Sequence, residues 1–241
     1  MPSEISSAKP RRALGGFLIR KEHWVLTWRA RICLALVLVA AALLFVRHIY
    51  SFLSVTDRVH GQYLVVEGWI PPETLTNAVA EFQRGGYQAI ITSGTVVRGH
   101  LNQPPDATVT YANWAASDLR KLGMPEDLVH AAPSFEDHRD RTYGSAVAVK
   151  NWLEDHHLPV SSIEVMTIGP HARRSRMLYE EAFGDKVKVG VIAIPSPDYD
   201  TKHWWRYSEG VRDVISETVA YLYAKFFFWP SLEDSGTSAA K

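Results

Sequence analysis

Short apolar runs alternate with helix-like patterns along most of the chain after Gln62. In the helix-like segments apolar side chains recur three or four positions apart, whereas the short runs are bounded by glycine, proline or polar residues. Strands are therefore predicted at 63–68, 89–94, 128–133, 163–169 and 187–195, and helices at 73–84, 107–122, 141–156, 171–183 and 208–227. This alternation predicts an α/β domain, a three-layer Rossmann-like parallel sheet of about five strands.

A different apolar pattern precedes this domain. Ile32 to Val46 contains fifteen residues without a polar side chain, which as a helix spans about 22 Å, less than the ~30 Å hydrocarbon core of a bilayer. Apolar residues resume at Ile49 and end at Leu53, so one transmembrane helix is predicted at 32–53. The alternative is a cleaved signal peptide, since Ala40-Ala41-Ala42 offers a small-residue cleavage site.

Charge then predicts the orientation of this helix. Residues 1–50 contain eight Lys or Arg and two acidic residues. By the positive-inside rule a basic tail at 1–31 lies in the cytoplasm, and the domain at 54–229 faces outward from the plasma (inner) membrane, in the periplasm or its equivalent. Residues 230–241 are small and polar, and they predict a disordered tail.

The composition of the outward part excludes several functions. Residues 51–241 contain 18 basic and 24 acidic residues, so no basic face for nucleic acid is expected. The single cysteine, Cys33, falls inside the apolar run, which leaves the domain without a thiol for catalysis, disulfide formation or metal binding.

Polar residues gather where the predicted strands end. In an open parallel sheet, ligands bind beyond the carboxyl ends of the strands, so these positions predict the site. Glu67 is a candidate general base or hydroxyl acceptor, and His171 is its candidate catalytic partner. The candidate ligand-binding residues at the same edge are Gly68, Ser93, Gly94, Thr95, Arg98, Arg141, Thr142, Thr167 and Arg174.

The most specific of these motifs is TIGPHARRSR, a predicted strand-to-helix turn. His171 and Arg174 are three apart and share one face of the first helical turn, where a helix already favours anions. They are predicted to bind a phosphate, pyrophosphate or carboxylate, with arginine in bidentate contact. The alternative is a solvated face on which the arginines pair with Glu180, Glu181 or other nearby acids.

Other chemistries have less support in the sequence. Ser93, His171 and either Asp140 or Asp198 can be assembled into a hydrolase triad, but Ser93 lies in T-S-G-T and not in G-x-S-x-G. The dinucleotide and P-loop glycine motifs do not occur. No metal site and no cofactor are assigned, because three histidine groups lack ligand spacing: His138 with Asp137 and Asp140, His156-His157, and Asp198 and Asp200 with His203.

Five short motifs in order resemble the ElyC/SanA/YdcF family, a domain of unknown function, over Tyr63 to Ile194. They are VVEG at 65–68, Ser93-Gly94, LGMP at 122–125, Thr142, and H-x-x-R at His171 and Arg174. The chain departs from the family at Thr95, where a second glycine is common, near Tyr111, where an acid is common, and at 141–145, where N-T-x-E-N is common.

The resemblance implies a Rossmann-like, often membrane-anchored domain of cell-envelope integrity and peptidoglycan metabolism. Together with the predicted pocket, it leads us to expect a ligand that bears a phosphate, either lipid-linked or nucleotide-like. Two alternatives stay open: a non-catalytic envelope factor that acts through protein partners, and a domain that binds S-adenosylmethionine or a nucleotide.

Overall fold

The computed structural model of the 241-residue chain describes residues 12–13, 18–19, 26–97, 109–135 and 141–230. It divides into two units, Met1–Phe45 and Val46–Lys241. In the first, the short strands β1 (Arg12–Ala13) and β2 (Leu18–Ile19) pair in antiparallel fashion. Helix α1 (Trp28–Leu53) begins in the first unit and ends in the second. The predicted tail at 230–241 lies outside the described residues except for Pro230.

Helix α1 has the properties expected of a membrane span. It contains 26 residues and is the one helix in the described part of the chain that is long and apolar enough to cross a membrane. It continues through Ala40–Ala42 without a break. Large apolar side chains are exposed along it, as suits a helix surrounded by lipid; they are Ile32, Leu34, Leu36, Val37, Leu38, Val39, Leu43, Leu44 and Phe45.

The second unit is built on a five-stranded sheet, which confirms the predicted fold class. Its strands are β3 (Tyr63–Glu67), β4 (Ala89–Thr95), β5 (Val129–Ser134), β6 (Ser162–Ile168) and β7 (Lys188–Ile194). All neighbours pair in parallel, in the order β5-β4-β3-β6-β7. The strand order reverses between β3 and β6, so a ligand crevice is expected at their carboxyl ends.

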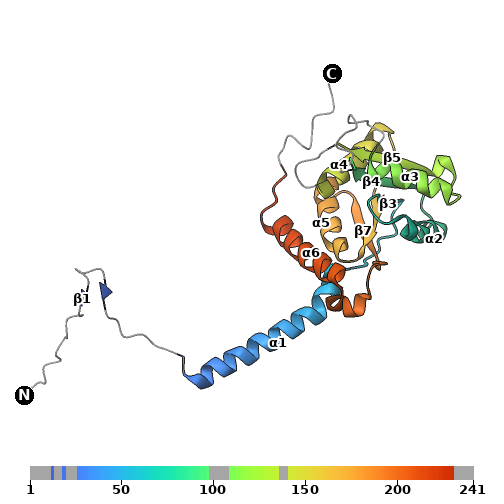
Figure 1. Ribbon diagram of the computed structural model, residues 1–241. Coiled ribbons are helices and arrows are strands. Elements are labelled where there is room, and N and C mark those ends of the chain that lie inside the picture. Colours follow the sequence, from blue (N-terminus) through green and yellow to red (C-terminus); the bar gives the residue numbers. More distant parts are fainter. Residues whose placement is uncertain (1–11, 14–17, 20–25, 98–108, 136–140, 231–241) are drawn as a thin grey trace, which may run out of the picture. The chain divides into compact units, whose positions relative to one another are not determined.

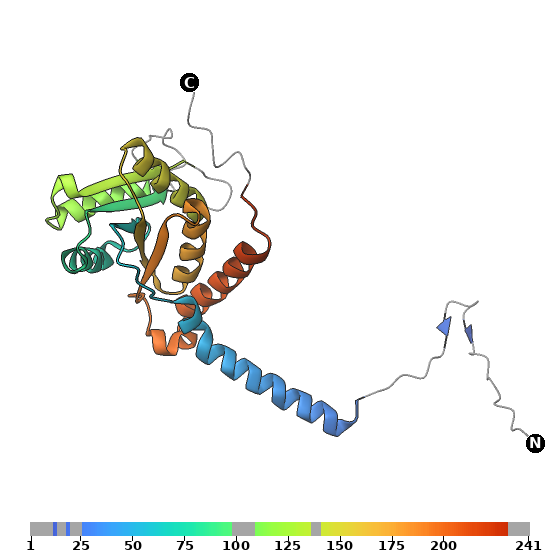
Figure 2. The ribbon, with the colours of Figure 1, turned by 180° about the vertical axis from the view of Figure 1, so that it is seen from behind.

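Helices cover both faces of this sheet. They are α2 (Leu75–Gly85), α3 (Tyr111–Lys121), α4 (Arg141–Asp155), α5 (Ala172–Phe183) and α6 (Ser208–Phe226), with short 3₁₀ turns η2 (Pro72–Thr74), η3 (Glu126–Leu128), η4 (Gly169–His171) and η5 (Thr201–Arg206). Helices α4 and α5 lie on one side of the sheet, and α2 and α3 lie on the other (Figure 1 and Figure 2).

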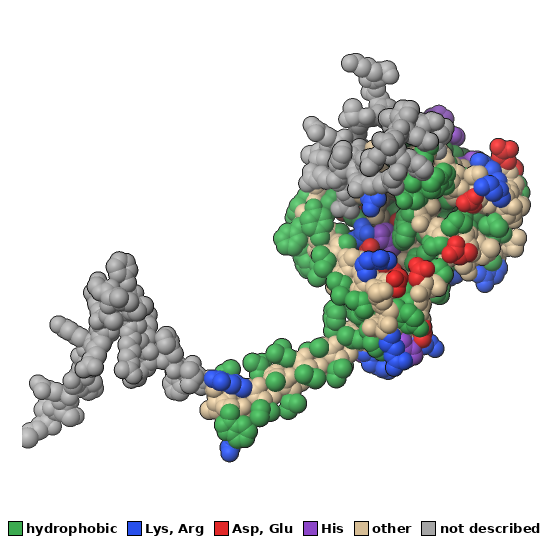
Figure 3. All heavy atoms as spheres, viewed as in Figure 1, with side chains coloured by type: hydrophobic (Ala, Val, Ile, Leu, Met, Phe, Trp, Pro, Cys, Tyr) green, Lys and Arg blue, Asp and Glu red, His purple; other side chains and the backbone are tan. Residues whose placement is uncertain are grey.

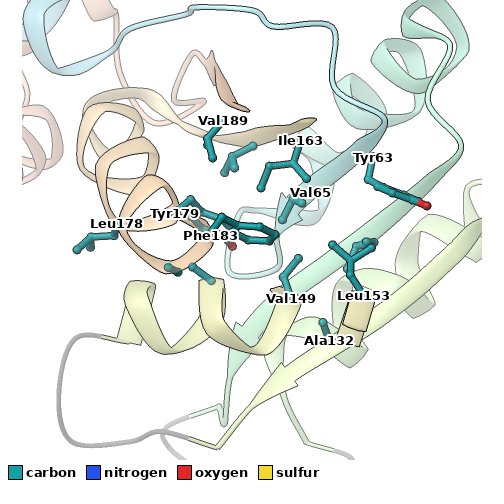
Figure 4. Packing of buried hydrophobic residues seen from close by; sticks show 14 of the residues in the cluster. Tyr63, Val65, Ala132, Val149, Leu153, Ile163, Leu178, Tyr179, Phe183 and Val189 are labelled. Atoms are coloured by element: carbon teal, nitrogen blue, oxygen red, sulfur yellow. The ribbon is translucent and has the colours of Figure 1, made fainter. Parts of the chain in front are cut away.

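Alternate side chains of a strand point to opposite faces of the sheet, and this decides which side of the core each one joins. In β3, Tyr63 and Val65 pack with the α4–α5 layer (Figure 4), whereas Leu64 and Val66 pack with the α2–α3 layer. All four are buried, because a parallel sheet with helices on both faces has no solvent-facing side.

The start of α3 differs from the prediction. A helix was predicted from residue 107, but α3 begins at Tyr111. Thr110 has an extended backbone, and its hydroxyl accepts a hydrogen bond from the Asn113 amide at 3.2 Å. This N-cap stops the helix from extending backwards.

The last two turns of α1 belong to the α/β unit. Ile49 and Leu53 are buried in a small cluster with Tyr199, Trp204 and Val214. The unit therefore begins within the helix, at Val46, and not after it at residue 54.

A side chain of α5 also holds this end of α1. Arg173 donates from Nε to the Phe52 carbonyl, and its guanidinium lies 4.0 Å from the centre of the Phe52 ring. Arg173 thus points away from the predicted ligand site.

Candidate functional site

Glu67, the last residue of β3, lies at the centre of a buried polar cluster at the carboxyl edge of the sheet. Its Oε2 accepts a hydrogen bond from Thr167 of the neighbouring strand β6, and its Oε1 accepts one from Ser175 Oγ at 2.9 Å. Trp69 Nε1 donates to Oε2 at 3.2 Å. These donors compensate the carboxylate for its removal from water.

His171 lies beside Glu67 because η4 follows β6 directly. Its Nε2 is 3.4 Å from Glu67 Oε2 and 3.5 Å from Thr142 Oγ1, while its Nδ1 is 2.9 Å from Glu217 Oε1. The edge of its ring meets Trp69 at a centroid distance of 4.9 Å. Arg174 Nη2 also lies 3.0 Å from His171 Nδ1. In the tautomer that donates from Nδ1 to Glu217, Nε2 faces Glu67 and is placed for general acid–base chemistry.

Arg174 lies about one helical turn after His171, and it binds the carboxylate of Glu217. Its Nε donates to Glu217 Oε2 at 2.9 Å and its Nη2 to Oε1 at 3.1 Å, which is a bidentate contact. Its Nη1 donates to Thr142 Oγ1 at 3.1 Å, at the start of α4. The alternative, in which the arginines pair with acids, describes Arg176, which pairs with Glu180 and Asp57 on an exposed face. Arg174 pairs with an acid too, but that acid is Glu217 of α6.

Glu217 is a residue of this cluster that the sequence did not predict, as is Ser175. It comes from α6, and it is mostly buried against His171 and Arg174. Burial acts to raise the pKa of the Glu217 carboxyl, but the hydrogen bonds and electrostatic attraction of His171 and Arg174 outweigh burial and hold that pKa well below its usual range. The available signal was an acid three residues after inward-facing Val214.

The glycine and serine candidates serve close packing at the ends of β3 and β4. A Cβ on Gly68 would lie 2.3 Å from the Tyr111 carbonyl oxygen, and Gly94 has φ +155°, which favours glycine. Ser93 Oγ hydrogen-bonds the buried Tyr179 hydroxyl at 2.8 Å, and Thr95 is buried at the end of β4. That these residues contact a ligand stays a prediction.

The serine-hydrolase arrangement is not present in the described residues. Ser93 makes no hydrogen bond with His171 there, and the acid that orients His171 is Glu217 and not Asp198. Arg98 and Asp140 lie outside the described residues, whereas Arg141 opens α4 with an exposed side chain.

No group of three metal-ligating side chains occurs among the residues that the structure describes. His156 stacks on Trp152, with 4.1 Å between ring centroids, and His203 pairs with Asp200, with 2.6 Å between Nδ1 and Oδ2. The predicted group around His138 lies outside the described ranges.

No protein-family model and no curated protein matches this chain. The resemblance to the ElyC/SanA/YdcF family therefore still depends on the five motifs. Four of them, those containing Glu67, Ser93, Thr142 and His171, lie at the carboxyl edge of the sheet. The fifth, Leu122–Pro125, follows α3 and leads into β5 at its amino end.

Proposed function

We propose that this chain is a membrane-anchored cell-envelope protein of the ElyC/SanA/YdcF type, which binds a phosphate-bearing ligand of peptidoglycan or other envelope-precursor metabolism. Helix α1 is the anchor, and the basic residues before it favour a cytoplasmic N-terminus with the α/β domain outside. A domain held at the outer membrane face meets lipid-linked precursors more readily than soluble cytosolic cofactors.

The observation that carries this proposal is the position of the Glu217 carboxylate. His171 Nδ1 and Arg174 Nε and Nη2 hold its two oxygens at 2.9 to 3.1 Å. Like a carboxylate, a phosphate group presents two oxygens that arginine can bind at the same time. A phosphate also carries more negative charge than a carboxylate. The Glu217 carboxylate thus occupies the place that we assign to the ligand phosphate, and the ligand displaces it.

The neighbouring residues then supply chemistry at the bound phosphate. Thr142 Oγ1 lies within hydrogen-bond distance of Arg174 and adds a hydroxyl to the anion site. Glu67 and His171, with 3.4 Å between Oε2 and Nε2, form the acid–base pair for a reaction there.

A second candidate is a non-catalytic envelope factor that acts through protein partners. It is favoured by one observation: two carboxylates, one arginine and one histidine of this cluster already satisfy one another. Such a cluster also forms where charged side chains only hold helices together. In that case the site has no affinity for phosphate.

Binding to the full-length protein in detergent separates the two candidates. Inorganic pyrophosphate and farnesyl phosphate serve as probes, and the thermal midpoint and calorimetric titration are measured. We expect Arg174→Ala to abolish binding and Glu217→Gln to strengthen it by about tenfold, because removing a competing charged partner is worth about 1.4 kcal/mol or more.

The matched control is Arg176→Ala, because Arg176 lies on the same helix but pairs with Asp57 and Glu180. It should bind both probes as the unmodified chain does. If the unmodified chain and Glu217→Gln bind neither probe, the phosphate site is refuted and the non-catalytic candidate is favoured.

The orientation has its own test. A topology reporter is fused after Trp229, and its activity is compared inside and outside the cell. Activity outside supports the envelope assignment. Activity only in the cytoplasm would remove it.

A further inference from the structure

The turn η5 is fixed to the end of the membrane helix. Trp204 is buried, and its Nε1 donates to the Val46 carbonyl oxygen at 3.3 Å. Its ring packs in the same cluster as Ile49 and Leu53. Wherever the last two turns of α1 lie in the membrane, η5 therefore lies beside them.

The depth of that contact follows from helix length. If the hydrocarbon core begins at Ile32, just after Arg31, about 20 helical residues are needed to cross ~30 Å, which ends near Ser51. Trp204 contacts Val46 and lies beside Ile49. Val46 precedes Ser51 by five helical residues, roughly 7.5 Å, so η5 is attached within about two helical turns of the boundary between hydrocarbon and headgroups.

The exposed side chains around Trp204 have the composition of such a boundary. Trp205 and Tyr207 are 42% and 40% exposed, and Lys202 and Arg206 are exposed beside them. Among the described residues, neither Lys202 nor Arg206 forms an ion pair. Figure 3 shows basic and histidine side chains gathered at this end of the domain.

From these observations we propose that η5 and Tyr207 form a second, interfacial contact with the bilayer. This inference depends on the proposed membrane anchoring. Trp205 and Tyr207 lie at the level of the glycerol and carbonyl groups, where amphipathic rings are most stable. Lys202 and Arg206 bind the phosphate groups of anionic lipids.

The occupant is a lipid surface and not a second protein, because the patch is continuous with the proposed membrane helix and combines aromatic rings with cations that form no ion pair in the described part of the chain. The contact also restricts the domain. A domain attached by a single helix can rotate relative to the membrane plane. A second contact beside that helix determines which face of the domain lies against the bilayer. Helix α6, which carries Glu217, begins at Ser208, directly after this patch.

The test uses the full-length chain in vesicles of phosphatidylcholine and phosphatidylglycerol. Cys33→Ala removes the one native thiol, and single cysteines are placed at Leu38, His203 or Glu126 and labelled with a fluorophore. Lipids that carry a quencher near the headgroup or in the acyl chain report the depth of each label. Glu126 is the control. It lies in η3, just before β5, and β5 is at the opposite edge of the sheet from β7, the strand that precedes η5.

We expect the label at 38 to be quenched from the acyl chains and the label at 203 to be quenched from the headgroups, several-fold more than the label at 126. Quenching at 38 with equal, weak quenching at 203 and 126 would overturn the interfacial contact and leave the anchor intact. An unquenched label at 38 would overturn the anchor, and the contact with it.

Charge is tested separately with Lys202→Ala and Arg206→Ala together, against Arg84→Ala and Lys121→Ala as a matched pair of exposed cations on α2 and α3. Thermal midpoints confirm that each variant is folded. The first pair should lose the increase in quenching at 203 that phosphatidylglycerol causes, and the second should keep it. Equal behaviour of both pairs would refute the role of Lys202 and Arg206.

Discussion

Glu217 Oε1 lies 2.9 Å from His171 Nδ1, although the two residues are 46 positions apart in the chain. One comes from the last long helix, α6, and the other from the turn between β6 and α5. The contact joins α6 to the carboxyl edge of the sheet, where Glu67 and Thr142 complete the cluster. The stability of this edge is therefore coupled to the ionisation of Glu217.

Stability should fall in acid because of Glu217. Its folded pKa lies below the unfolded value of about 4.3, so its contribution is full above that value and is lost as pH falls toward the folded pKa. Glu217→Gln removes one partner of a buried ion pair and should cost about 3 kcal/mol at pH 7. Thermal midpoints between neutral pH and pH 3 should show this difference shrinking. Asp118→Asn, at an exposed pair with Lys121, should show little difference at any pH.

Glu164 should behave in the opposite way. It is fully buried in β6 and accepts the amides of Val59 and Gly61, and burial raises the pKa of its carboxyl. Its contribution is therefore full below the unfolded value of about 4.3 and is lost as pH rises through the raised folded pKa. Relative to the unmodified chain, Glu164→Gln should gain stability as pH rises through this window. Calorimetric thermal midpoints of the two chains measure this difference. A constant difference across the window would contradict this account.

The hydroxyls of Ser93 and Tyr179 should be energetically coupled. They lie 2.8 Å apart in the core, and burial raises the pKa of the Tyr179 hydroxyl above its usual range. Ser93→Ala or Tyr179→Phe alone leaves one buried hydroxyl unsatisfied and should cost about 1 to 3 kcal/mol. The double variant should cost less than the sum, as measured by denaturant unfolding. Strict additivity would mean that the hydrogen bond contributes nothing.

Gly68→Ala should destabilise the domain and disturb the site edge. The new Cβ would lie 2.3 Å from the Tyr111 carbonyl oxygen and 2.9 Å from the Ser93 carbonyl oxygen, both of which are backbone atoms. Overpacking of this kind costs about 1 to 3 kcal/mol or more. Gly86→Ala, which meets open space but has φ +69°, is the control and should cost about 1 kcal/mol. Equal thermal midpoints for the two variants would show that the start of α3 shifts to accommodate the new Cβ at little cost in stability.

The sequence was sufficient for the elements of the domain because their signals are local. The five strands lie within one or two residues of their predicted bounds, since buried parallel strands are short apolar runs between turn residues. The start of α3 was predicted four residues early, because the cap at Thr110 is a single hydrogen bond that periodicity does not record.

The polar cluster at the carboxyl edge of the sheet was predicted in part, for the same reason. Glu67, Thr167, His171 and Arg174 each follow or end a strand, and the parallel fold brings such positions together. Ser93 also lies at this edge, but its hydroxyl turns to Tyr179, which the strand pattern does not reveal. Arg98 lies outside the described residues.

The sequence alone thus determined the apolar helix, the α/β class and the edge at which polar groups gather, because each depends on periodicities within a few turns of chain. Tertiary structure decided which charges meet. Only packing of α6 against α5 brings Glu217 to His171 and Arg174, and only packing of η5 on α1 brings Trp204 to Val46. Contacts between distant segments depend on how whole helices pack, and no local pattern encodes them.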